Sequence, residues 1–295
     1  MNIQSLSIVV PNLGCINKCP FCISRMVNSN TYPNKMDIND PQYDINVREY
    51  LNKLRFVADN GCQTLILTGT SEPQQNRQFL ATFALLHQQI GSPFTNIEMQ
   101  TTGVTLENNR NYLRFLRNFV GVNTVALSVN ALCNEMNNRI IGQGGKTFLT
   151  LENLCEQLKE YGFNIRICCN LTSLFDLDRN PLKNVFEFIN KNLRADQVTF
   201  RKMYSSSEDT EQGKWLSEHQ FPDESMKELE NYINKFPVIG KTMYGSPIHD
   251  ILGMSVICDG DCMGKNPETD VKKYLILRPN CHLYSQWDTK ASLIN

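Results

Sequence analysis

Hydrophobic and polar residues alternate along the first two thirds of the chain in a way that predicts a repeated strand–helix unit. Short apolar runs, rich in β-branched residues, predict strands at 5–10, 64–68, 96–101, 124–129, 164–171 and 197–202. Apolar positions at helical spacing lie between them, at about 47–57, 79–86, 109–119, 151–161 and 182–189. Strands that alternate with helices favour a parallel sheet with right-handed crossovers.

The repeat ends near residue 204. Residues 204–221 are polar and predict a loop, which we expect to act as a lid, and a helix is expected near 223–236. Strand-like pieces follow at 254–257 and 274–277. Six strand–helix units are two short of a closed eight-stranded barrel. The fold class is therefore predicted to be α/β, a partial (β/α)6 TIM barrel over residues 1–203, with a C-terminal extension over 204–295 that contributes to the substrate site.

Composition and charge limit the classes of partner that the protein is expected to bind. The 295 residues carry a formal net charge of -1, with no cluster of Lys and Arg, so neither a nucleic-acid surface nor an anionic membrane partner is indicated. The start of the chain lacks the basic stretch of a signal peptide, and no segment predicts a membrane span. We therefore expect a cytoplasmic protein that acts on a small molecule. In a reducing compartment, eleven cysteines indicate metal ligation and core packing rather than disulfides.

Three cysteines lie close together directly after the first predicted strand. Cys15, Cys19 and Cys22 fall within eight residues, in a segment rich in Gly, Asn and Pro. Thiolates are the usual ligands of iron–sulfur clusters, and three of them leave one iron of a cubane without a protein ligand. A structural zinc site needs four ligands, and no second Cys or His pair is near. The alternative is a chance cluster of buried thiols.

The spacing C-x3-C-x2-C after the first strand of a partial barrel resembles the radical S-adenosylmethionine (SAM) superfamily. Phe21 stands before the last cysteine, where members of this family commonly carry an aromatic residue. The resemblance implies a [4Fe–4S] cluster held by Cys15, Cys19 and Cys22, and SAM bound at the open iron. It also implies reductive cleavage of SAM to a 5′-deoxyadenosyl radical, with a flavodoxin- or ferredoxin-type electron donor.

A second segment at the end of the second strand supports this interpretation. Gly69, Thr70, Ser71 and Glu72, followed by Pro73, resemble the family's Gly-Gly-Glu-Pro segment, which contacts the amino group of SAM. The match is partial, because Thr70 and Ser71 replace the second-glycine region. Taken alone, the segment would be interpreted as an ordinary connection between a strand and a helix, and its position one strand–helix unit after the cysteines is what favours a SAM contact.

Polar residues at the ends of later strands complete the predicted cofactor site. Ser128 and Asn130 share one face of a strand end, as do Arg166 and Asn170 on the next strand. In resembling enzymes such residues bind the ribose hydroxyls and the carboxylate of SAM, and Met203 would offer its backbone to the adenine. The alternative for Arg166 and Asn170 is that they fill a polar barrel interior.

The remaining cysteines divide into two sets. Cys258, Cys262 and Cys281 either bind an auxiliary cluster or are core and surface thiols. The others are expected to be structural: Cys62, Cys133, Cys155, Cys168 and Cys169. Two other classes of function remain open at this point, a non-catalytic iron–sulfur electron carrier or sensor and a zinc-binding interaction module.

Overall fold

One sheet of eleven strands organises the computed structural model, in the order β13-β12-β2-β3-β4-β5-β6-β7-β10-β9-β8. The structure describes residues 2–12, 14–26, 45–142, 149–175, 177, 181–203, 210–242, 245–259, 271–287 and 292–294. Its six central strands are β2 (Ser5–Val9), β3 (Thr64–Thr68), β4 (Asn96–Thr101), β5 (Thr124–Val129), β6 (Asn164–Leu171) and β7 (Gln197–Lys202). All six are parallel and follow chain order, which confirms the predicted units.

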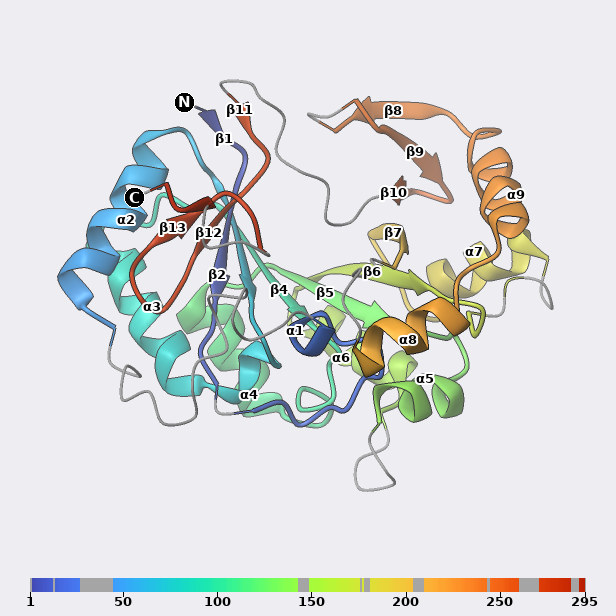
Figure 1. Ribbon diagram of the computed structural model, residues 1–295, viewed down its shortest axis with the longest axis horizontal. Coiled ribbons are helices and arrows are strands. Elements are labelled where there is room, and N and C mark those ends of the chain that lie inside the picture. The colour runs from blue at the N-terminus through green and yellow to red at the C-terminus, as the bar shows by residue number, and fades with distance from the viewer. Residues whose placement is uncertain are drawn as a thin grey trace.

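Helices connect these strands (Figure 1). They are α1 (Ile23–Met26), α2 (Val47–Asp59), a 3-10 turn (Pro73–Gln75), α3 (Arg77–Gln89), α4 (Arg110–Arg114) running into a π-helical stretch (Phe115–Val120), α5 (Asn134–Ile141), α6 (Leu151–Glu160) and α7 (Leu182–Lys191). Asparagine side chains cap three of them. Asn46, Asn76 and Asn109 accept hydrogen bonds from the backbone N–H three residues on, at 3.2, 2.9 and 3.3 Å.

The extension is part of the same sheet. It contributes α8 (Glu211–Glu218), α9 (Asp223–Ile233), β8 (Val238–Lys241), β9 (Pro247–Ile251), β10 (Met254–Asp259), β11 (Val271–Lys272), β12 (Leu275–Leu277) and β13 (Leu283–Tyr284). Strand β10 pairs parallel with β7, and β12 pairs parallel with β2. The parallel part therefore has eight strands, yet β10 and β12 do not pair with each other, so the barrel stays open. Strands β1 (Asn2–Ile3) and β11 form a separate parallel sheet of two strands.

The predicted loop over 204–221 is wrong in its second half. Residues 211–218 form α8, where the Thr210 hydroxyl accepts a hydrogen bond from the Gly213 N–H at 3.1 Å. Leu216 is buried on this helix, so tertiary packing stabilises it. The mostly polar composition of the segment gave no sign of this apolar contact. Residues 204–209 lie outside the described part of the chain.

Side chains along the strands point alternately into the hydrophobic core and into the interior of the barrel. Leu65, Leu67, Ile97 and Met99 point outward and are buried in the main hydrophobic core. Their neighbours on the other face, such as Thr64, Thr68, Asn96 and Gln100, line a cavity inside the sheet. This period of two makes the interior of the open barrel polar. No helix in the described ranges has the length and apolar character needed to cross a membrane.

Candidate active site

The three predicted cluster ligands lie in the loop between β2 and α1. Cys15, Cys19 and Cys22 are all partly buried and none forms a disulfide. Burial raises the pKa of the Cys19 thiol, and the charges of Cys22, Glu72 and Cys15 raise it further. The pKa of Cys15 is also raised, mainly by burial. The raised pKa of Cys19 therefore reflects both its burial and the nearness of the other two thiols.

A buried carboxylate fixes the middle of the cysteine loop. Glu72 is 5% exposed, and its Oε1 accepts a hydrogen bond from Asn17 Nδ2 at 2.8 Å. The same carboxylate accepts bonds from the Thr102 N–H at 3.1 Å, from Gln74 Nε2 at 2.6 Å and from the Thr101 hydroxyl. Glu72 therefore ties the cysteine loop to the end of β4. Asn17 was not predicted, since no motif distinguishes it from other loop asparagines.

The two residues that end the 3-10 turn hold the start of the same loop. Asn76 Nδ2 donates to the Pro11 carbonyl at 2.6 Å. Gln75 donates to the Gly14 carbonyl at 3.1 Å and accepts from the Ile16 N–H at 2.9 Å. Residues 72–76 thus hold residues 11–17 in place through side-chain hydrogen bonds. The sequence predicted SAM contacts at Gly69, Thr70, Ser71 and Glu72 and did not indicate Gln75 or Asn76.

The far end of the loop rests on α5. The Lys18 N–H donates to the carbonyl of Ile141, the last residue of that helix, at 3.0 Å. Gly142 follows with φ of 73°, and a Cβ added there would lie 2.9 Å from the Cβ of Lys18. Only glycine accommodates both the left-handed backbone and this close approach.

The segment after β3 comes equally close to the chain after β2. A Cβ on Gly69 would lie 2.8 Å from the Val10 carbonyl oxygen, so any larger residue would push the two strands apart. Thr70 is partly buried, and the Ser71 hydroxyl is buried with no hydrogen-bond partner among the described residues. An orphaned buried hydroxyl is costly unless a ligand satisfies it. This segment therefore has the features of a ligand-binding turn.

Strands β5 and β6 bring two predicted residues together. Asn170 Nδ2 donates to Asn130 Oδ1 at 3.0 Å, and both side chains are buried. Asn137 of α5 accepts from the Asn130 N–H at 2.9 Å, while its own amide nitrogen is buried without a described partner. Ser128 precedes them on the same face of β5 and is partly buried. Asn137 was not predicted, because it lies in a helix that the sequence pattern did not indicate.

Arg166 lies apart from the asparagine cluster, which consists of Asn130, Asn137 and Asn170. It sits four residues before Asn170 on β6, where its guanidinium pairs with the buried Glu98 carboxylate at 2.5 Å. Its Nε also donates to Gln197 Oε1 at 2.7 Å. A strand rises about 3.3 Å per residue, so Arg166 lies roughly 13 Å before Asn170 along β6.

Phe21 and Met203 share a small hydrophobic cluster that covers the cysteine loop. Phe21 is buried, and its ring lies 5.9 Å from that of Trp215 on α8. Leu216 of α8 is buried in the same cluster, and Met203 and Cys19 pack against it. Helix α8 lies beside α1 in Figure 1. A helix of the extension, α8, therefore covers the cysteine loop.

The later cysteines have separate surroundings. Cys258 on β10 is partly buried and contributes to the raised pKa of Cys169. The Cys281 thiol lies 3.6 Å from the Asn46 carbonyl, beside α2. Strands β10 and β12 are separated in the sheet by six others. Cys262 lies outside the described residues.

The donor set of the cysteine loop fits an iron–sulfur cluster. Thiolates bind such clusters one iron at a time, so the ligands need not converge on a point as they do around zinc. Within the described ranges, no three His, Cys, Asp or Glu side chains are arranged to hold a single metal ion. The orphaned polar atoms of Ser71 and Asn137 offer contacts for a polar ligand nearby.

Comparison with known proteins gives the family. A family model described as the radical SAM superfamily matches residues 9–189. Coproporphyrinogen III oxidase (HemN) from Escherichia coli, described as a radical SAM enzyme, superposes with a TM-score of 0.51 at 16% identity, over 79% of this chain and 52% of HemN. Methylornithine synthase (PylB) gives 0.49 at 15% identity, over 78% of this chain and 62% of PylB. The chain thus spans about half the length of HemN.

No curated protein sequence matches the chain significantly. The family match nevertheless covers more than half of the 295 residues, and it includes the cysteine loop, residues 72–76 and the asparagine cluster. The similarity to HemN independently supports the fold, because it includes most of this chain. The chain belongs to the radical SAM superfamily, and it is an enzyme of the kind that uses a [4Fe–4S] cluster and S-adenosylmethionine.

Proposed function

We propose that Cys15, Cys19 and Cys22 are the three ligands of the [4Fe–4S] cluster. The observation that carries this proposal is the set of three free thiols in one loop, fixed along its length by residues 72–76 and by α5. When bound, the cluster delivers the electron that cleaves SAM to methionine and a 5′-deoxyadenosyl radical, which abstracts hydrogen from the substrate.

The residues around the loop have distinct proposed roles toward SAM. The backbone of Gly69, Thr70 and Ser71 meets its amino group, with the Ser71 hydroxyl as a further contact, and Glu72 holds this segment against the cysteine loop. The remaining cofactor contacts come from Phe21, Ser128, Asn130, Asn170 and the backbone of Met203. Asn130 and Asn170 are supported by their direct hydrogen bond and by the donor of Asn137 beside them.

We assign Arg166 to the barrel wall below this site. Its guanidinium already serves Glu98 and Gln197, and it lies four residues before Asn170. In this position it lines the cavity in which a substrate would lie, rather than the strand ends that hold SAM.

The substrate is proposed to be a small molecule, and the electron donor a flavodoxin- or ferredoxin-type protein in the cytoplasm. We retain the division into a radical-generating core, 1–203, and an extension, 204–295, that shapes the substrate site. Lys273, Tyr274 and Trp287 of the extension support that role, because they line the interior cavity. Helix α8 supports a covering role for part of 204–221.

The decisive experiment is anaerobic reconstitution with iron and sulfide, followed by reduction with dithionite in the presence of SAM. We expect about four irons per chain, the content of one cubane, and release of 5′-deoxyadenosine. Zinc in place of iron would indicate an interaction module. A stable cluster that never cleaves SAM would indicate an electron carrier or sensor and would contradict the proposal.

A further inference from the structure

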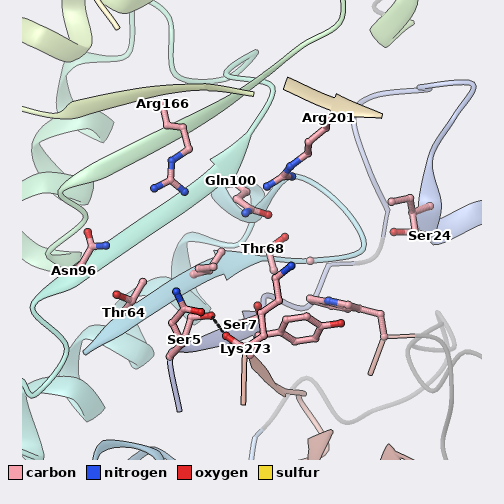
Figure 2. Close-up of a pocket in the computed structure, with 16 residues that line it drawn as sticks. Ser5, Ser7, Ser24, Thr64, Thr68, Asn96, Gln100, Arg166, Arg201 and Lys273 are labelled. Carbon is pink, nitrogen blue, oxygen red and sulfur yellow. Dashed lines mark hydrogen bonds between the residues drawn. The ribbon is translucent and has the colours of Figure 1, made fainter. Parts of the chain in front are cut away.

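A polar cavity occupies the interior of the open barrel. It has a volume of about 480 Å³ and adjoins a second cavity of about 320 Å³ (Figure 2). The two share Gln4, Arg166, Arg201 and Lys273 in their walls. Each volume falls in the range of about 300–1,000 Å³ that is typical of small-molecule sites.

One end of this cavity reaches the proposed cofactor site. Ile23 and Ser24, which directly follow Cys22, line it together with Gly69. Its other end is lined by residues at the starts of the strands, including Thr64 and Asn96. A molecule bound in the cavity would therefore lie along the barrel axis with one end next to the cysteine loop.

The charges on the wall are predominantly positive. Arg166, Arg201 and Lys273 all line the larger cavity, and no Asp or Glu is among the described residues that line either one. Glu98 lies on the same face of β4 as Asn96 and Gln100, but it is buried, and its carboxylate pairs with Arg166 and accepts from Gln100. A guanidinium has five N–H donors and an ammonium three, so Arg201 and Lys273 can each serve a ligand in addition to their protein contacts.

Arg201 and Lys273 each line both cavities, so a ligand in the region that the two cavities share can contact both. Arg201 is in register with Asn170 on the neighbouring strand, so it lies at the level of the proposed SAM contacts. Figure 2 shows the guanidinium groups of Arg166 and Arg201 pointing toward the region where Gln100 lies. Arginine binds carboxylate and phosphate through paired N–H donors, and the surrounding hydroxyls and amides suit a hydrogen-bonding ligand.

We propose that the substrate is a polar metabolite with an oxyanion, either a phosphate or a carboxylate, held by Arg201 and Lys273 inside the barrel. The proposal rests on the proposed function, because it treats the cavity as the substrate site of that reaction. It adds a chemical class of substrate and two residues that select it.

The test is calorimetric binding to the reconstituted protein with SAM already bound, so that the carboxylate site of SAM is filled. The probes are ribose 5-phosphate, succinate and uncharged ribose, and they distinguish phosphate from carboxylate. We expect one of the two oxyanions to bind and ribose not to bind. The Arg201→Gln/Lys273→Gln variant should weaken that binding at least tenfold. SAM affinity, measured separately, should stay within twofold of wild type.

The matched control is Arg110→Gln/Lys227→Gln, which removes two exposed cations from α4 and α9. It should bind the probes as wild type does. Equal weakening in both double variants would show only long-range electrostatics, and absence of binding by either oxyanion would overturn the proposal. Loss of SAM affinity with unchanged probe binding would assign the cations to SAM instead. Release of 5′-deoxyadenosine by wild type tests the proposed function independently.

Discussion

The side-chain amide of Asn17 donates a 2.8 Å hydrogen bond to the buried carboxylate of Glu72, across 55 residues of sequence. The same amide also donates to the Thr102 hydroxyl at 2.9 Å. The middle residue of the loop that carries the three cysteines is thereby joined to both neighbouring strand ends. This places the position of the loop under the control of side chains that need not contact iron or SAM.

Glu72→Gln should therefore destabilise the metal-free protein. The new amide would turn an N–H donor toward groups that now donate to the carboxylate, and an unsatisfied buried donor costs about 1–3 kcal/mol. Chemical unfolding measures this directly, without a cluster. Glu228→Gln on the exposed face of α9 is the control and should leave stability unchanged. Equal unfolding midpoints for Glu72→Gln and wild type would show that the hydrogen bonds to the Glu72 carboxylate do not stabilise the fold.

Cys19→Ala should abolish cluster binding and release of 5′-deoxyadenosine, because it removes one of three thiolate ligands. Iron and sulfide analysis after reconstitution gives the first measurement, and chromatography of the SAM reaction gives the second. Cys133→Ala is the matched control, since Cys133 is free and exposed. A Cys19→Ala protein that still cleaves SAM reductively would show that the ligands are elsewhere.

Asn170→Ala should weaken SAM binding about tenfold while leaving the iron content intact. The change removes the proposed hydrogen bond of Asn170 to SAM, together with the donor that orients Asn130, a loss of about 1.5 kcal/mol. Equilibrium binding of SAM to the reconstituted protein provides the measurement. Unchanged affinity would mean that the asparagine cluster only fills the barrel.

Arg166→Ala should act on stability rather than on SAM affinity. It leaves the Glu98 carboxylate, 1% exposed, without its cation. Breaking a buried pair costs about 3–5 kcal/mol, and the partial exposure of Arg166 places the expected loss at the lower end. The Arg166→Ala/Glu98→Ala double variant should lose less than the sum of the two single variants. Additive losses would show that the pair is not coupled.

Iron content should be unaffected in a Cys258→Ala/Cys281→Ala variant. Cys258 lies on β10 beside Cys169, whereas Cys281 lies between β12 and β13 with its thiol near the start of α2. We therefore expect the two thiols not to share one cluster. A content near eight irons per chain that falls by half in this variant would show an auxiliary cluster, about two cubanes in all.

Local patterns predicted most of the core. All six central strands were located to within one residue because each is a short segment of apolar residues, continuous in β3 and interrupted by polar residues in the other five, between helical patterns. The interior and exterior faces followed from the period of two. The cysteine loop was found from spacing alone, since three closely spaced thiols in a polar loop are typical of metal ligation and not of core packing.

Long-range pairing was not predictable in the same way. Strands β10 and β12 were identified as strand-like pieces, but nothing in their composition indicates that they pair with β7 and β2. Arg201 was missed because its role depends on which face of β7 lines the cavity and on the strands opposite. The same holds for Gln75 and Asn76, whose importance comes from bonds to residues about 60 positions earlier.

The pairing of β2 with β12 has a consequence for how the chain reaches its native state. Residues 5–9 leave the ribosome some 270 residues before their partner strand, 275–277. The Ser5 hydroxyl likewise donates to the carbonyl of Lys273, which is made equally late. Until then one edge of the nascent sheet exposes unpaired backbone groups, which favour pairing with other chains. Contacts of such long sequence separation also slow folding. During synthesis the chain therefore carries an unprotected strand edge until residues 275–277 have been made.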